Sequence, residues 1–161
     1  MPFPQCYWRP RYARQVPRLF RRQPDSSGLP TPRIFTRVFC DPGTLLNTVG
    51  FYRSLTGQQS DMDMDVPEAG LHIVAVGGFL IIELDRATRP DATATAATVL
   101  VADLDQAVAE RVAAGAEVIQ ERRSAPVGAG ARLRHPDGLI AEYVEHRPSQ
   151  HDVSQPGEAF R

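Results

Sequence analysis

The sequence predicts an α+β fold made of two successive copies of a strand–helix–three-strand unit (βαβββ). Hydrophobic residues recur at strand or helix spacing from residue 34 to residue 146. The order of these segments repeats after roughly 60 residues, and each copy closes with a β-hairpin. Because one copy cannot cover its own sheet, we expect both to form a single domain over 34–146, with modules at about 34–84 and 95–146.

In the first copy, residues 34–40 are rich in β-branched and aromatic side chains and predict a strand. Apolar residues at helical spacing then predict a helix that begins at Leu45 and ends at Gly57. The polar, alternating segment 58–65 predicts an edge strand. Two apolar runs, 71–76 and 79–84, are joined by Gly77-Gly78, which predicts a hairpin with a two-residue turn.

The second copy follows the same order. Residues 95–102 predict a strand, and Asp103 is a suitable N-cap for a helix that ends at Gly115. Residues 116–124 predict a further strand. The final hairpin is expected over 129–135 and 139–146, around the turn Pro136-Asp137-Gly138.

Composition and charge narrow the classes of partner. The chain has 161 residues, of which 42% are hydrophobic and 23% charged, and all 18 of its basic residues are arginine. Seven arginines fall in residues 1–33 with one acid, so the remainder is acidic, which argues against a nucleic-acid-binding domain. No apolar run approaches the ~20 residues that span a bilayer, so we expect no membrane insertion.

The ends of the chain have no periodic pattern. The prolines in residues 1–33 forbid a continuous helix or central strand, so we expect a disordered Arg/Pro-rich extension there. Alternatively, this extension is a basic arm for an acidic partner, a membrane or nucleic acid, or an organelle transit peptide. Residues 147–161 predict a polar tail. Cys6 and Cys40 make no disulfide framework, which favours a reducing compartment, and we expect a cytoplasmic protein.

Four segments resemble motifs of the vicinal oxygen chelate superfamily, which includes glyoxalases, bleomycin-resistance proteins and extradiol dioxygenases. Residues 51–57 (FYRSLTG) resemble the end of its first helix, and 101–107 (VADLDQA) resemble its second strand-to-helix junction. Residues 112–116 (VAAGA) and 135–143 (HPDGLIAEY) resemble the end of the second helix and the last hairpin. The resemblance implies a cup-shaped mixed β-sheet with flanking helices.

The resemblance also implies a divalent metal in the cup, held by one residue from the first strand and one from the last strand of each module. Those positions fall near Ile34, at Glu83, near Ala96 and at Glu142. Both carboxylates are present, but the first-strand ligands, usually histidine, are absent. Two carboxylates hold a divalent ion poorly, so we expect no metal cofactor. A relocated metal site at His72, Glu83 and Glu142 is the alternative.

The hairpin turns predict which residues face one another. His72 should oppose Glu83 and Val74 should oppose Ile81, because directly opposed residues share a sheet face. In the last hairpin, Arg132 should oppose Glu142, and Arg134 should oppose Ile140. A polar group of this kind in an apolar cup is typical of a small-molecule site, but these pairs also fit cross-strand ion pairs on an exposed or dimer-facing surface.

The candidate catalytic residues are those with titratable side chains: Glu142, Glu83 and His72, with His72 as a general base oriented by Glu83. The candidate ligand-binding residues are Arg132, Arg134, Thr36, Val74, Ile81, Thr98, Leu100 and Tyr143.

The sequence is compatible with two functions. The first is a homodimeric protein of the bleomycin-resistance type that binds a small organic ligand without a metal. The second is a glyoxalase-type lyase or isomerase, or a dioxygenase, with an atypical divalent-metal site. The missing first-strand ligands favour the first.

Overall fold

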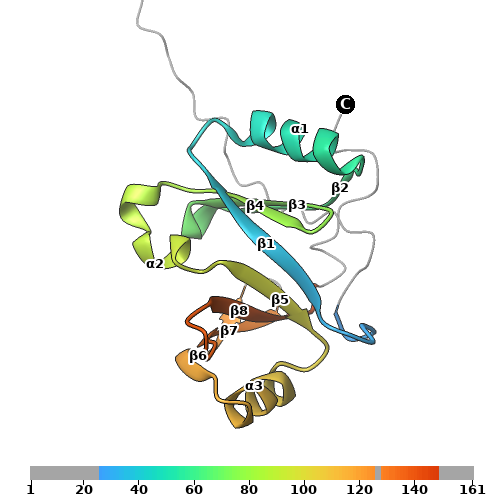
Figure 1. Cartoon of the computed structure of the whole chain (residues 1–161). Helices are drawn as coiled ribbons and strands as arrows, with labels where there is room; N and C mark the ends of the chain where they lie inside the picture. The colour runs from blue at the N-terminus through green and yellow to red at the C-terminus, as the bar shows by residue number, and fades with distance from the viewer. Residues whose placement is uncertain (1–25, 126–127, 149–161) are drawn as a thin grey trace, which may run out of the picture.

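The computed structural model of the chain describes residues 26–125 and 128–148, and Figure 1 shows how their elements are arranged. The first module contains a long strand, a helix and three further strands, as the sequence predicts. A short 3-10 turn, η1 (Pro67–Ala69), separates two of these strands. The elements are β1 (Arg33–Cys40), α1 (Leu45–Thr56), β2 (Ser60–Val66), β3 (Leu71–Val76) and β4 (Phe79–Glu83).

The second module repeats this order after a connection that the sequence did not assign. That connection holds a 3-10 turn, η2 (Arg86–Thr88), and a single helical turn, α2 (Pro90–Thr93). The module itself consists of β5 (Ala97–Val101), α3 (Leu104–Ala113), β6 (Glu117–Ala125), β7 (Gly128–Arg134) and β8 (Ile140–His146).

All the strands belong to one mixed sheet in the order β2-β3-β4-β1-β5-β8-β7-β6. Within each module the first and last strands are parallel, β1 with β4 and β5 with β8, whereas β1 and β5 join the modules in antiparallel fashion. The predicted α+β fold of two βαβββ modules is therefore confirmed. In Figure 1, α1 and α3 lie at opposite ends of this sheet.

Both predicted hairpin registers are confirmed. His72 lies opposite Glu83 in the first hairpin, and Arg132 lies opposite Glu142 in the second. The turns determine this result: Gly77 has a φ of 59°, which the tight two-residue connection requires and which a side chain would disfavour.

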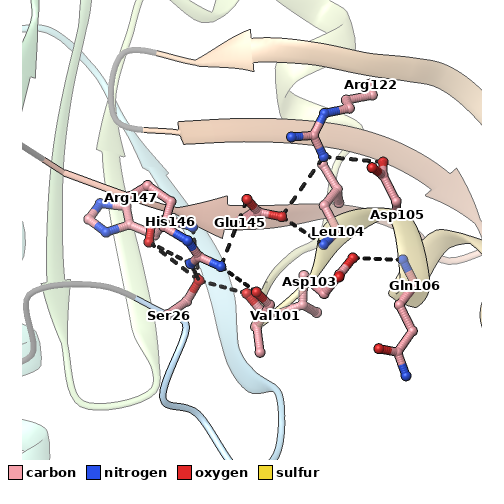
Figure 2. Close-up of polar contacts among 11 residues, drawn as sticks. Ser26, Val101, Asp103, Leu104, Asp105, Gln106, Arg122, Glu145, His146 and Arg147 are labelled. Atoms are coloured by element: carbon pink, nitrogen blue, oxygen red, sulfur yellow. Dashed lines mark hydrogen bonds and ion pairs between the residues drawn. The ribbon is translucent and has the colours of Figure 1, made fainter.

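The helices begin and end where their caps predict. The Asp103 carboxylate accepts a hydrogen bond from the Gln106 amide at 2.9 Å, and Gly57 ends α1 with a φ of 65°. A second carboxylate helps at the start of α3, since Glu145 on β8 accepts from the Leu104 amide at 2.9 Å (Figure 2). These contacts fix α3 against the second module.

Each helix covers one face of its own module. Under α1, Val74 and Ile81 pack with Leu45 in one apolar cluster, and under α3, Leu104 packs with Leu133 and Tyr143 in another. The opposite face of the sheet is hollow and shared by both modules. Alternation along the strands therefore separates helix-covered residues from residues that face this hollow.

The segment before β1 contacts the body of the domain. The buried Ser26 hydroxyl donates to the Val101 carbonyl at 2.6 Å and accepts from the His146 amide at 2.9 Å, as Figure 2 shows. Arg147 also donates to it, and Leu29 packs against an apolar cluster of the first module. Part of the expected disordered extension is thus ordered: Ser26 contacts β5 and β8, Leu29 packs on an apolar cluster of the sheet, and Arg33 begins β1. Residues 1–25 and 149–161 lie outside the described part of the chain.

The helices of the described residues are all too short or too polar to cross a lipid bilayer.

Candidate functional site: the cup

The hollow face of the sheet contains a cavity of about 880 Å³, here called the cup. This volume is typical of small-molecule sites, which occupy ~300–1,000 Å³. Every strand contributes residues to its lining, from the face of the sheet that the helices do not cover. Its first-module wall is mainly apolar and includes Phe35, Phe39, Met62, Met64, Ile73 and Ile82. The charged residues of this module that line the cup are Arg33, Arg37, Asp61 and Glu68.

The second-module wall of the cup is polar and charged. Thr98 projects from β5, Arg132 from β7 and Glu142 from β8, while β6 contributes Gln120 and Arg123. The cup therefore has a mainly apolar wall from the first module and a mainly polar wall from the second, with Arg37 of the first module and Leu100 and Val144 of the second as exceptions. A small molecule with both an apolar and a polar part would find a matching surface for each.

Arg37 and Glu142 form a buried ion pair at the base of the cup. A guanidinium nitrogen of Arg37 donates to Glu142 Oε2, and Arg37 Nε donates to Thr98 Oγ1 at 2.8 Å. The two side chains are only 8% and 19% exposed. Burial lowers the pKa of the Arg37 guanidinium, and the Glu142 carboxylate opposes that shift. The pair links the first strand of one module to the last strand of the other.

Two further arginines surround Glu142 without being fully neutralised. Arg123 Nη2 lies 3.4 Å from Glu142 Oε1. Arg132, although in register with Glu142, donates instead to the Asp91 carbonyl at 2.9 Å and reaches Thr95 Oγ1 at 3.5 Å. Arg37 and Arg123 thus share the Glu142 carboxylate, and Arg132 lies beside them on the same wall without an ion pair to it. The predicted Arg132–Glu142 pairing holds for the backbone, but the ion pair of Glu142 goes to other arginines.

The structure places Glu83 and His72 outside the cup. Glu83 lies on the helix-covered face, where its Oε1 accepts from the Gly43 amide at 2.8 Å. His72 Nε2 lies 2.6 Å from Asp63 Oδ1, and this hydrogen bond raises the pKa of His72 against the effect of burial. The expectation that Glu83 orients His72 is therefore wrong, and Glu83 and Glu142 lie on opposite faces of the sheet. The relocated metal site cannot assemble from these three residues.

Several other candidates also lie away from the cup. Val74 and Ile81 pack under α1, and Thr36 is exposed on the same outer face. Tyr143 packs under α3 and shares a 2.9 Å hydrogen bond with His135, while Arg134 forms an exposed ion pair with Glu117. Of the predicted ligand-binding residues, those that do line the cup are Arg132, Thr98 and Leu100.

The cup-facing residues of β1, β4, β5 and β8, the strands on which the resemblance implies metal ligands, do not fit a divalent ion. On the cup face, Arg37 of β1 lies opposite Leu80 of β4, and Thr98 of β5 lies opposite Glu142 of β8. This set offers one carboxylate and one hydroxyl, with a cation and a hydrocarbon at the other two positions. Within residues 26–125 and 128–148, no group of three or more His, Cys, Asp or Glu side chains could hold a metal ion.

The sequence reasoning missed Arg37 and Arg123. Arginine does not ligate metals, so Arg37 fits none of the metal-ligand positions that the resemblance implies on β1. The sequence did contain a signal for Arg37. It alternates with Phe35 and Phe39 along the strand, so all three side chains point to the same face of the sheet.

Comparison with solved structures supports the fold, although no protein-family model and no curated protein matches the sequence. An uncharacterised protein from Methanosarcina mazei is 29% identical, with a TM-score of 0.62, over 71% of this chain and 91% of that chain. Methylmalonyl-CoA epimerase from Mycobacterium tuberculosis is 15% identical, with a TM-score of 0.50, over 72% and 88%.

The Streptomyces coelicolor methylmalonyl-CoA epimerase, in complex with 2-nitronate-propionyl-CoA, is 20% identical with a TM-score of 0.50, over 71% of this chain and 96% of that chain. At such identities the epimerases show a shared fold and nothing about the reaction. The likeness covers both modules, because each match extends over most of the described residues.

Proposed function

We propose that this chain, which has the fold of the vicinal oxygen chelate superfamily, binds a small organic molecule in its cup and does so without a divalent metal. The observation that carries the proposal is the cup itself: a cavity of about 880 Å³ with a mainly apolar wall from one module and a mainly polar wall from the other. Pockets of this size and make-up commonly bind small molecules.

The Arg37–Glu142 pair supports the metal-free part of the proposal. A permanently charged guanidinium lies among the cup-facing residues of β1, β4, β5 and β8, where the fold would place metal ligands. It already satisfies the Glu142 carboxylate that a metal would need. A divalent cation there would face repulsion from Arg37 and would find too few oxygen or nitrogen donors.

Binding can be tested with N-phenyl-naphthylamine, an uncharged dye that fluoresces in apolar pockets. We expect saturable binding by the wild-type protein. Ile73→Trp places a bulky ring on the apolar wall and should weaken binding about tenfold or more, since overfilling a packed site excludes other groups. Ile34→Trp is the matched control, because Ile34 is 63% exposed and lies outside the cup.

The two tryptophan variants should differ in dye binding. Ile34→Trp should bind the dye as the wild type does. Absence of saturable binding by the wild type, or equal loss in both variants, would show that the cup is not the ligand site.

A further inference from the structure

We infer that the ligand of the cup is an organic anion, whose charged group lies against Arg132 and Arg123 while its apolar part lies against the first-module wall. This inference rests on the proposed function and names its ligand class. Three observations support this inference. The second-module wall carries more positive than negative charge, two of its arginines keep unused N–H donors, and the apolar surface of the cup lies apart from the charged one.

The charge balance around Glu142 is positive. Arg37 and Arg123 share this one carboxylate, with Arg37 at the shorter contact, while Arg132 lies opposite Glu142 in the β7–β8 register and forms no ion pair with it. The other acids that line the cup do not correct the balance. Asp61 is paired with Arg33 at 2.5 Å, while Glu68 and Asp91 are exposed at the rim. The surplus positive charge therefore lies on Arg123 and Arg132.

These two arginines are held in place but retain donors. Within the described ranges, Arg132 forms no ion pair, and its hydrogen bonds to the Asp91 carbonyl and to Thr95 Oγ1 both use Nη1. The Arg123 side chain is 58% exposed and touches Glu142 only at 3.4 Å. Guanidinium groups recognise carboxylates, sulfonates and phosphates through paired, charge-assisted hydrogen bonds. An anion between β6 and β7 would supply the missing counter-charge.

The anion must also carry an apolar part. Met64, Ile73 and Ile82 face the cup from β2, β3 and β4, on the opposite side of the cavity from the arginines. An inorganic ion would contact only the charged wall and leave this apolar surface in water. An organic anion would contact both the apolar surface and the charged surface, which come mainly from different modules.

A pair of dyes with the same aromatic body tests the inference. Anilinonaphthalene sulfonate carries one sulfonate, and N-phenyl-naphthylamine carries none. Because a sulfonate loses hydration on burial, a cup without surplus positive charge would prefer the neutral dye. We expect the wild-type protein to bind the sulfonate more tightly than the neutral dye, with a preference that decreases as salt is raised.

Three variants assign the preference to residues. Arg132→Gln and Arg123→Gln should each weaken sulfonate binding about tenfold and leave the neutral dye within about twofold. Arg134→Gln is the control, since Arg134 lies two residues further along β7 and pairs with Glu117 outside the cup. It should bind both dyes as the wild type does. The neutral dye also reports whether each variant keeps an intact cup.

The outcomes separate this inference from the proposed function. A wild-type protein that prefers the neutral dye, or an Arg134→Gln variant that loses the sulfonate as Arg132→Gln does, would overturn the anion preference alone. A protein that binds neither dye would overturn both. Retained sulfonate binding by Arg132→Gln and Arg123→Gln would also contradict the inference, because it would locate the anion elsewhere.

Discussion

Arg37 on β1 and Glu142 on β8 form an ion pair between residues that are 105 positions apart in the sequence, across the intervening strand β5. Each comes from a different module, so the pair helps to hold the modules in one sheet. Arg37 also donates to Thr98 on β5, which places all three strands in one polar contact at the base of the cup.

Replacing Glu142 by Gln should destabilise the protein by about 2 kcal/mol or more. The glutamine keeps a hydrogen-bond acceptor but leaves the buried Arg37 guanidinium without its counter-charge, and uncompensated buried charges are costly. Chemical denaturation of the two proteins measures the difference. Glu117→Gln is the control, since it removes the carboxylate of an exposed pair and should cost less than ~1 kcal/mol.

A double-mutant cycle isolates the pair itself. Arg37→Met removes the buried cation, so adding Glu142→Gln to it should cost less than Glu142→Gln costs alone. Additive effects of the two substitutions on the free energy of unfolding would show that the two side chains do not interact in solution.

The Ser26 hydroxyl should contribute measurably to stability. Ser26→Ala would leave the His146 amide and the Val101 carbonyl without this partner in a buried position, at a cost of about 1–3 kcal/mol. Ser54→Ala, at an exposed position on α1, should have little effect.

The disordered extension expected over residues 1–33 would be removable without loss of stability. We now expect a chain without 1–31 to melt at a lower temperature than a chain without 1–25.

The melting temperatures of these variants test whether the Ser26 contacts stabilise the fold. Equal melting temperatures for the two truncated chains, together with an unchanged Ser26→Ala variant, would mean that the Ser26 contacts in Figure 2 do not stabilise the protein.

The His72–Asp63 contact predicts a pH-dependent contribution to stability. The hydrogen bond that His72 donates to Asp63, with further help from the charges of Asp63, Asp65 and Glu83, raises the folded-state pKa of His72 although burial lowers it. A raised pKa stabilises the folded state fully below the unfolded value of ~6.5, and this stabilisation disappears as the pH rises through the folded value. His72→Gln should therefore lower the melting temperature at about pH 5.5 more than at about pH 8.5.

Asp63→Asn should remove the same pH dependence, because it deletes the partner that favours the protonated imidazole. A loss in melting temperature that is equal at both pH values would contradict this assignment.

We also propose that the chain is a homodimer at micromolar concentration. β2 lies at one end of the sheet with an unpaired edge, and α1 exposes Leu46, Phe51 and Leu55. Exposed apolar side chains and free strand edges favour association. Sedimentation velocity should give a mass near twice 17.8 kDa. A monomeric mass at that concentration would refute the proposal.

Much of the fold follows from local chemistry in the sequence. The turns at Gly77-Gly78 and Pro136-Asp137-Gly138 fix the pairing of the flanking strands, so the opposition of His72 with Glu83 and of Arg132 with Glu142 was predictable. Helix ends at Asp103 and Gly57 follow from capping preferences in the same way.

Which face of a strand lines the cup was harder to predict. In the first hairpin both faces are apolar: Ile73 and Ile82 face the cup, whereas Val74 and Ile81 face α1. A strand covered on both sides has no polar face to indicate its orientation. The resemblance placed Glu83 in the cup, and the register then placed His72 on the same side, which is the side away from the cup. In the last strand, Glu142 and Tyr143 were both predicted to line the cup, but neighbouring residues of a strand point to opposite faces, and Tyr143 packs under α3.

The partners of charged side chains were not predictable, because they depend on contacts between distant strands. Arg37 reaches Glu142 across β5, and Arg132 reaches the connection between the modules at Asp91. Neither contact follows from hairpin geometry, which relates only neighbouring strands.

Metal content and dye binding, measured on the same purified sample before and after exhaustive chelation, test the central claim most directly. We expect no stoichiometric zinc, nickel, iron or manganese, and an affinity for N-phenyl-naphthylamine that chelation does not change, because the Glu142 carboxylate is already paired with Arg37. Stoichiometric metal whose removal abolishes dye binding, and whose return restores it, would contradict the account.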